Sequence, residues 1–359
     1  MQKSFINKFF PVPGFLVMSS VGFDISDQTI KYAGLVQKNN GLQLGKFGSI
    51  RLETGIIKSG EIIGQEKFKK ILSDFSKKED IKFVRVALSE QQIYLFTLSL
   101  PEMEYKTISG AIELQLEEHI PIDVNNVIFD FEILEKKDGK MMVQVVASQK
   151  GIVENYISLI KEAGMIPLSI EVEGQAIARS VIKKGSNETV MIVDFGELRT
   201  GISVVSNENI HFTSTIDIGG ISITKLIEKN FGISFEEAEE LKQKTGLKKT
   251  VTHSDLFPVL LNGVSVLRDE INRHFVYWHT HKEDSGLDRP HIEKIILCGG
   301  DSNLPGLKDY LSASLRVKVE IADVWVNINS FGKYIPEINF NNSLGFATAL
   351  GLALRDFDI

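Results

Sequence analysis

The feature that most constrains this chain is a short pattern that occurs twice. Residues 20–35, SVGFDISDQTIKYAGL, form an apolar run that ends in Asp24, followed by a small polar turn and a second apolar run. Residues 190–205, VMIVDFGELRTGISVV, repeat this order around Asp194. Each copy continues through another turn into a third apolar run. Internal repetition of this kind predicts two related lobes, each beginning with a strand–turn–strand unit.

Each of these turns combines a carboxylate at the end of a buried strand with free backbone N–H groups. The second turn also contains Gly196 and Thr200. Backbone N–H groups suit phosphate oxygens, and a carboxylate suits metal-bound water. One Asp–x–Gly turn alone is ordinary turn chemistry. Two such turns that face each other predict a phosphate site between the lobes.

Two glycine pairs lie beside expected helices. Gly219 and Gly220 precede a helix, where they allow either a close approach of a ligand or a tight strand-to-helix turn. Gly299 and Gly300 follow a buried strand, and Ser302 lies in the polar loop after them. The carboxyl end of a strand is where open α/β sheets bind ligands. The second pair therefore predicts a bare backbone edge at a binding site.

Composition excludes several classes of protein. The 359 residues carry a net charge of −7, which argues against a general nucleic-acid binder. The single cysteine, Cys298, forms no internal disulfide and fits a reducing compartment. No apolar run reaches the ~18 residues of a membrane span. A soluble globular protein with two full cores is expected from the length and from the 43% hydrophobic content.

The order of expected elements suggests four parts. Residues 1–18 form an N-terminal arm, which either packs on the domain or docks on a partner or a membrane surface. Residues 84–166 read as a compact strand–strand–helix–strand–strand–helix block, whose first helix is expected over residues 104–119. The first lobe then comprises residues 19–83, 167–187 and 344–359, and the second lobe comprises residues 188–343.

Several motifs together resemble the actin-like ATPase superfamily. They are the two aspartate turns, Gly219-Gly220 before a helix, EEAEELK at residues 236–242 and CGGDSNLPG at residues 298–306. The inserted block and the closing ATALGLALR are similar to the PilM family of type IV pilus assembly proteins, relatives of the cell-division protein FtsA. The resemblance implies an α/β fold with two actin-like lobes, which are duplicated ribonuclease-H-like units with mixed sheets. It also implies a small α+β subdomain inserted in the first lobe.

The resemblance implies ATP and Mg²⁺ as ligands, with at most weak ATPase activity. Asp24 and Asp194 would act on Mg²⁺ through water, and Glu239 and Lys242 would lie near the ribose and adenine. No residue is distinctive as a base for attacking water. The nucleotide-binding residues that the resemblance implies are Asp24, Ser26, Asp194, Gly196, Thr200, Gly219, Gly220, Glu239, Lys242, Gly299, Gly300 and Ser302.

The chain departs from the family pattern in both turns. Ser26 stands where glycine is usual, so the backbone there approaches phosphates less freely. Glu197 and Arg199 stand where small or polar residues are usual. Arg199 is expected to pair with a phosphate, or with Glu197 when no phosphate is bound.

The implied function is that of a scaffold in pilus assembly. The family's inserted subdomain helps to form a groove that binds the cytoplasmic N-terminal tail of PilN, an inner-membrane protein, and we expect this groove between the block and the first lobe. Other proteins of the pilus motor are further candidate partners. The expected location is cytoplasmic, at the inner membrane through these partners. An FtsA-like filament-forming protein of cell division and a small-molecule kinase of the same superfamily remain alternatives.

Overall fold

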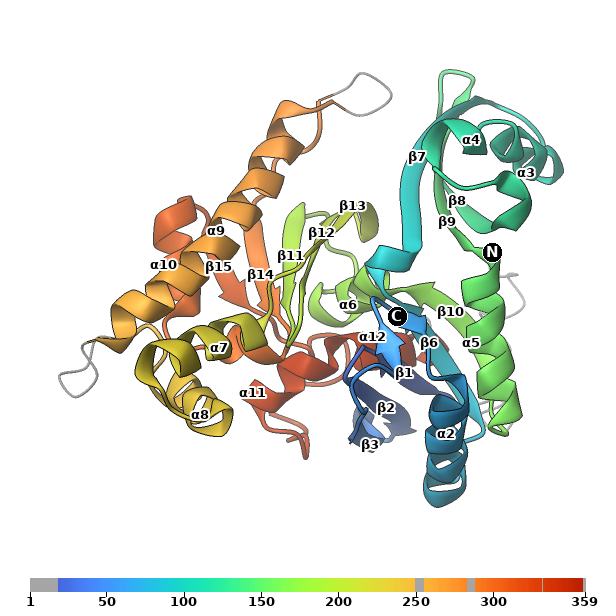
Figure 1. Ribbon diagram of the computed structural model, residues 1–359. Helices are drawn as coiled ribbons and strands as arrows, with labels where there is room; N and C mark the ends of the chain where they lie inside the picture. The colour runs from blue at the N-terminus through green and yellow to red at the C-terminus, as the bar shows by residue number, and fades with distance from the viewer. Residues whose placement is uncertain (1–18, 249–254, 283–287, 331, 358–359) are drawn as a thin grey trace.

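Two sheets with the same topology form the two lobes of the protein (Figure 1). The computed structural model describes residues 19–248, 255–282, 288–330 and 332–357, so the arm expected at residues 1–18 lies outside the described residues. The strand orders are β3-β2-β1-β6-β10 and β13-β12-β11-β14-β15. In each sheet the first strand pairs antiparallel with the second and parallel with a strand that follows a crossover. The duplication predicted from the two aspartate turns is thus a duplication of whole sheets.

In the first lobe, helices cover both faces of the sheet, the outer face and the face toward the second lobe. Its strands are β1 (Val21–Ile25), β2 (Thr29–Lys38), β3 (Gly41–Arg51), β6 (Phe83–Leu88) and β10 (Ile166–Val172). A short hairpin, β4 (Ile57–Lys58) and β5 (Glu61–Ile62), precedes the helices α2 (Gln65–Glu79) and α5 (Lys150–Glu162), which pack on the outer face. Strand β1 is buried along its whole length, as its apolar sequence predicts.

The second lobe repeats this arrangement with more helices on its outer face. Alternate residues of β11 face opposite ways: Val190 and Ile192 point toward the centre of the molecule, and Met191 and Val193 point toward the outer helices. The strands are β11 (Val190–Phe195), β12 (Thr200–Ser206), β13 (Asn209–Ile216), β14 (Lys294–Cys298) and β15 (Lys318–Ile321). The helices are α7 (Gly220–Phe231), α8 (Phe235–Thr245), α9 (Leu256–Thr280) and α10 (Leu307–Leu315).

Two helices, α6 (Glu173–Val181) and α12 (Ala347–Leu354), lie between the sheets (Figure 1). They pack at backbone distance, because small residues line the crossing. A Cβ on Gly351 of α12 would lie 1.7 Å from the carbonyl oxygen of Ala176, and one on Gly22 of β1 would lie 2.1 Å from that of Ala349. The strand β1, α12 and α6 therefore form three layers with no side chain between them at these points.

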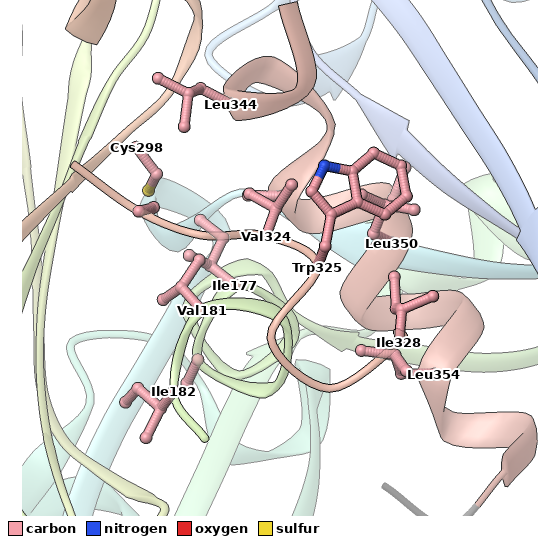
Figure 2. Packing of buried hydrophobic residues seen from close by; sticks show 14 of the residues in the cluster. Ile177, Val181, Ile182, Cys298, Val324, Trp325, Ile328, Leu344, Leu350 and Leu354 are labelled. Atoms are coloured by element: carbon pink, nitrogen blue, oxygen red, sulfur yellow. The ribbon is translucent and has the colours of Figure 1, made fainter. Parts of the chain in front are cut away.

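The segment that follows β15 completes the central core. Figure 2 shows Trp325 beside Leu350 of α12, with Ile328 near Leu354. The same segment reaches the first lobe, where the Asn329 side chain donates to the backbone oxygen of Leu42 at 3.0 Å. Residues 322–330 and 332–338, which the sequence assigned to the second lobe, thus also contact the first lobe through the central core.

The inserted subdomain is smaller than the block expected at residues 84–166. Strand β6 lies inside the first sheet, paired with both β1 and β10, and α5 packs against α2 in the first lobe's core. The insertion itself comprises β7 (Ile93–Pro101), α3 (Tyr105–Glu113), α4 (Leu116–His119), η3 (Val124–Asn126), β8 (Val127–Lys137) and β9 (Lys140–Gln149). The sequence missed this boundary because β6 and β7 are adjacent in the chain and equally apolar.

The helix expected over residues 104–119 is two helices. A backbone hydrogen bond from Gln115 N–H to the Ile112 oxygen (2.9 Å) tightens the turn between α3 and α4. Ile108, Ile112 and Leu116 still face the inserted sheet, so their apolar spacing was read correctly. Leu114, which lies at the break, is 86% exposed.

The close contact of α12 with α6 yields a stability prediction. Gly351→Ala should lower the free energy of unfolding by about 3 kcal/mol or more, because the new methyl group collides with backbone atoms that cannot move independently. Gly110→Ala in α3 is the matched control, since a Cβ there meets no atom within 4 Å and alanine favours helix. Denaturant unfolding of both variants checks this; equal stabilities would contradict the packing described.

Candidate functional site

A cavity of about 430 Å³ lies between the lobes, where the carboxyl ends of β1 and β11 face each other. Both aspartate turns contribute to its wall. The predicted site residues that line it are Asp24, Ser26, Asp194, Gly196, Glu239, Lys242, Gly299 and Gly300. Thus eight of the twelve predicted residues lie around one space, although they come from four separate parts of the chain.

The first turn accommodates serine without strain. Ser26 N–H donates to the Thr29 oxygen at 2.9 Å, and the Ser26 hydroxyl accepts from Thr29 N–H at 3.1 Å. Ser26 is absent from the residues with positive φ in the described part of the chain. The departure from glycine therefore costs little in backbone freedom, because the serine side chain closes its own turn.

The second turn is fastened to the start of α7. Gly220 N–H donates to the Gly196 oxygen at 3.0 Å, and Ile221 N–H donates to the Glu197 oxygen at 2.9 Å. A Cβ on Gly219 would lie 2.4 Å from the same Glu197 oxygen. Gly219 and Gly220 do not line the cavity. Of the two readings that the sequence left open for this pair, the structure favours the tight turn.

Thr200 and Ser302 also lie behind the cavity wall rather than on it. The Thr200 hydroxyl donates to the Ile218 oxygen at 2.6 Å, and the Ser302 hydroxyl donates to the Cys298 oxygen. Both side chains are buried and fully engaged with backbone. They shape the turns that carry Gly196 and Gly300.

Four carboxyl groups, of which Asp24 is buried and the others are half-buried, line the cavity. Burial raises the pKa of Asp194 to about 6, with a further rise from Asp24 and an opposing effect of Lys31. Burial also raises the pKa of Asp24, against the same lysine. The pKa of Glu90 is raised to about 8 by burial and by the charge of Asp194, and that of Glu173 is raised by burial and by Glu90. A site with this excess of negative charge favours a divalent cation or protons.

Glu90 and Glu173 were not predicted from the sequence. Glu173 is the first residue of α6 and directly follows β10, a parallel strand, so the rule that located Asp24 could also have located it. Glu90 lies in the short helix η2 (Glu90–Gln92) after β6, and the same rule locates it only once β6 is known to be a parallel strand of the first sheet. Space for its carboxylate comes from Gly201 and Gly174, where a Cβ would lie 2.9 and 3.1 Å from the Glu90 oxygens.

Glu239 and Lys242 belong to a charged network in the wall of the cavity. The Lys242 ammonium lies 2.9 Å from Glu239 and 2.7 Å from Asp301, and it donates to the Gly220 oxygen at 3.2 Å. Only 4% of the Lys242 side chain is exposed. The lysine thus joins α8 to the start of α7 and to the loop after β14.

Two ion pairs join the lobes beside the cavity. Arg199 pairs with Asp27 of the first turn, and Arg51 of β3 pairs with Glu197 at 2.7 Å. The pairing of Arg199 with Glu197 that the sequence suggested is therefore wrong. Arg199 and Glu197 each pair instead with a residue of the first lobe: Arg199 with Asp27, and Glu197 with Arg51.

A second cavity, of about 1060 Å³, lies between the first lobe and the inserted subdomain. Its walls include consecutive residues of two strands, 128–133 of β8 and 167–172 of β10. Helix α5 contributes Val153, Ile157 and Lys161, which lie on one face at helical spacing. We call this cavity the partner-side groove.

The part of the chain that the structure describes has neither a metal site built from protein ligands alone nor a membrane-spanning helix. No group of three or more histidine, cysteine, aspartate or glutamate side chains there is arranged to hold a metal ion on protein ligands alone. No helix in the same part of the chain is long and apolar enough to cross a membrane. Mg²⁺ held by one or two carboxylates, waters and phosphates needs no such protein cage.

Comparison with known proteins agrees with the class that this geometry defines. The two duplicated lobes with facing aspartate turns are those of the actin-like ATPase fold. The family described as type IV pilus assembly protein PilM matches residues 22–357. The chain belongs to this family.

Solved structures show the same fold over nearly all of the chain. The structure described as the PilM-PilN type IV pilus biogenesis complex has a TM-score of 0.77 and 21% identity, covering 95% of this chain and 99% of that one. MreB5 of Spiroplasma citri bound to ADP has a TM-score of 0.57 and 13% identity, covering 94% and 96%. These neighbours establish the fold, and the ADP is a property of MreB5.

Curated relatives match over shorter segments. The cell division protein FtsA of Enterococcus hirae is 25% identical over 191 residues, which are 48% of this chain and 42% of FtsA. The chain spans about half the length of the first curated relatives that it matches. The likeness to FtsA reflects the shared actin-like fold.

The raised pKa of Glu90 predicts how stability depends on pH. The unfolded carboxyl ionises near pH 4.5 and the folded one near pH 8, so the folded protein binds more protons between these values. Its free energy of unfolding therefore falls as pH rises through this window. Without nucleotide or metal, Glu90→Gln should stabilise the protein by about 2 kcal/mol or more near pH 8 and by much less near pH 5.

Thermal melts of wild type and Glu90→Gln across this pH range check the prediction. Glu188→Gln is the control, since Glu188 is a half-exposed partner of Lys294 far from the cavity. A stabilisation by Glu90→Gln that is the same at both ends of the range would contradict the raised pKa.

Proposed function

We propose that the chain is a nucleotide-binding scaffold of type IV pilus assembly, which binds Mg-ATP between its lobes and the PilN cytoplasmic tail in the partner-side groove. The observation that carries the proposal is the meeting of both aspartate turns in one interlobe cavity. Membership of the PilM family supports the biological setting, and the structure of a PilM–PilN complex supports the partner. In this role the protein acts at the cytoplasmic face of the inner membrane through its partners.

The cavity's donor set fits a nucleotide. Asp24 and Asp194 would hold Mg²⁺ through water, and Lys31 lies beside them to offset the charge of the phosphates. Gly300 presents bare backbone, since a Cβ there would meet no atom within 4 Å. Glu239 and Lys242 also line the cavity, and the nucleoside would bind beside them.

A nucleotide in this place would supply a phosphate chain that contacts both lobes at once. The chain's own groups would then orient that phosphate chain and neutralise it. Glu173 and Glu90 also line the cavity, and either one takes up a proton from water only in its ionised form, which a bound cation favours. This is consistent with weak hydrolysis and does not require it.

Removing one metal-organising carboxylate tests the nucleotide site. Asp194→Asn should weaken Mg-ATP binding about tenfold or more, because outer-sphere ligands typically contribute 10–100-fold to metal affinity. Calorimetric titration measures this. In EDTA the variant should bind ATP at least as tightly as the wild type does, because it lacks one carboxylate that repels the metal-free phosphates. Wild-type affinity for Mg-ATP in Asp194→Asn, or the absence of any nucleotide binding by wild type, would contradict the site.

The shape of the partner-side groove suits an extended peptide. The groove is lined by consecutive residues of two strands, 128–133 and 167–172, whereas the face of a strand contributes only every second residue. The groove therefore follows the edges of β8 and β10. Both strands lie at the edge of their sheets in the described part of the chain. Such edges bind a peptide by adding a strand, with pockets for its side chains.

The groove's chemistry combines apolar walls with a charged floor. Ile128, Val146 and Ile157 are among its apolar residues. At the floor, Glu171 accepts from Arg179 at 2.9 Å and from Arg355 at 2.8 Å. An extended tail with apolar side chains and polar backbone groups is the kind of partner that fits.

A charge placed in the groove tests the partner site. Leu168, the extra residue at the bulge of β10, lines the groove, and Leu168→Glu should weaken binding of a labelled peptide copying the PilN tail about tenfold. Leu114→Glu is the matched control, because Leu114 is 86% exposed and does not line the groove. Fluorescence anisotropy measures both. Equal loss in the two variants would contradict the proposed location.

A further inference from the structure

Arg199 is a cation of the cavity that can change partners. It pairs with Asp27, also donates to Gln91, and 22% of its side chain is exposed. The two lysines that line the cavity differ from Arg199: Lys242 is buried in ion pairs with Glu239 and Asp301, and Lys31 acts electrostatically on Asp24 and Asp194. Arg199 lies in the second turn itself, beside the place proposed for phosphates.

Asp27 keeps partners when Arg199 leaves. Its carboxylate accepts from Ser59 N–H at 2.8 Å and from Gly60 N–H at 2.9 Å. Ser59 and Gly60 form the β4–β5 turn, and both have positive φ, at 53° and 79°. Serine in this region is uncommon, so the turn depends on its contact with the carboxylate. The loss of Arg199 would leave Asp27 bound to the turn alone.

The same turn contacts the helix that lines the partner-side groove. The Tyr156 hydroxyl donates to the Gly60 oxygen at 2.8 Å, and Tyr156 is 2% exposed. Tyr156 belongs to α5, and its neighbours on the same helix, Val153 one turn earlier and Ile157 next in the chain, line the groove. A continuous set of hydrogen bonds therefore joins Arg199 to α5 through Asp27, Gly60 and Tyr156.

We propose that Arg199 determines specificity for a nucleoside triphosphate, binding the terminal phosphate in exchange for Asp27, and that the Asp27–Gly60–Tyr156 connection transmits this exchange to α5. This inference rests on the proposed nucleotide site. A guanidinium binds phosphate through two parallel hydrogen bonds, and two charged partners strengthen them. A diphosphate, which lacks the terminal group, would leave the Arg199–Asp27 pair intact.

The first test compares affinities for Mg-ATP and Mg-ADP by calorimetry. Wild type should prefer ATP, and Arg199→Gln should lose about tenfold in ATP affinity with little change for ADP. Arg51→Gln is the matched control. It removes the same charge and the other interlobe ion pair, but Arg51 is 60% exposed and does not line the cavity. Its ratio of ATP to ADP affinity should equal that of wild type.

The second test measures hydrogen–deuterium exchange in helix α5 rather than nucleotide affinity. Hydrogen–deuterium exchange of Lys150–Glu162 should differ between the Mg-ATP and Mg-ADP states of wild type. Tyr156→Phe removes only the hydroxyl that binds Gly60, so it should bind both nucleotides as wild type does and lose that difference. Arg199→Gln should lose it as well.

The outcomes separate this inference from the function on which it rests. If wild type binds no nucleotide, the proposed function fails. If wild type binds nucleotide but Arg199→Gln keeps its preference for ATP, the specificity role is overturned. If exchange in α5 is the same in both nucleotide states, or still differs in Tyr156→Phe, the connection through Tyr156 is overturned.

Discussion

The structure depends on the backbone-level packing of α12 between β1 and α6. Gly22 and Gly351 leave no side chain at the two crossings, so the three layers lie as close as their main chains allow. Interiors packed in this way resist small displacements. The contact sets the end of β1, with Asp24, against the start of α6, with Glu173, and thereby fixes the first-lobe side of the cavity.

From this arrangement the two candidate sites follow as neighbours. The interlobe cavity lies at the carboxyl ends of the central strands, and the partner-side groove lies at the outer edge of the same first sheet. Strand β6 lies between β1 and β10 in that sheet, and Glu90 follows it. The first lobe thus forms one wall of each site, which is the physical basis for expecting them to influence each other.

Internal repetition and local sequence patterns were enough to predict the two lobes and part of the site. The two lobes followed from the Asp24 and Asp194 turns, and the edge at Gly299-Gly300 followed from a strand that ends in glycine. It could not assign β6 to the first sheet, because pairing with β1 and β10 is a long-range choice. Glu90 and Asp27 were missed for the same reason: their partners, Ser203 and Arg199, lie far away in the chain.

The most direct measurement is a calorimetric titration of a peptide copying the PilN tail into the wild-type protein saturated with Mg-ATP and, separately, with Mg-ADP. Coupling between two sites is reciprocal and is typically 5–150-fold. The account predicts that the two peptide affinities differ by about fivefold or more. Tight peptide binding that is identical in both nucleotide states would contradict it, and the protein would then be an adaptor whose interlobe cavity plays no part in holding its partner.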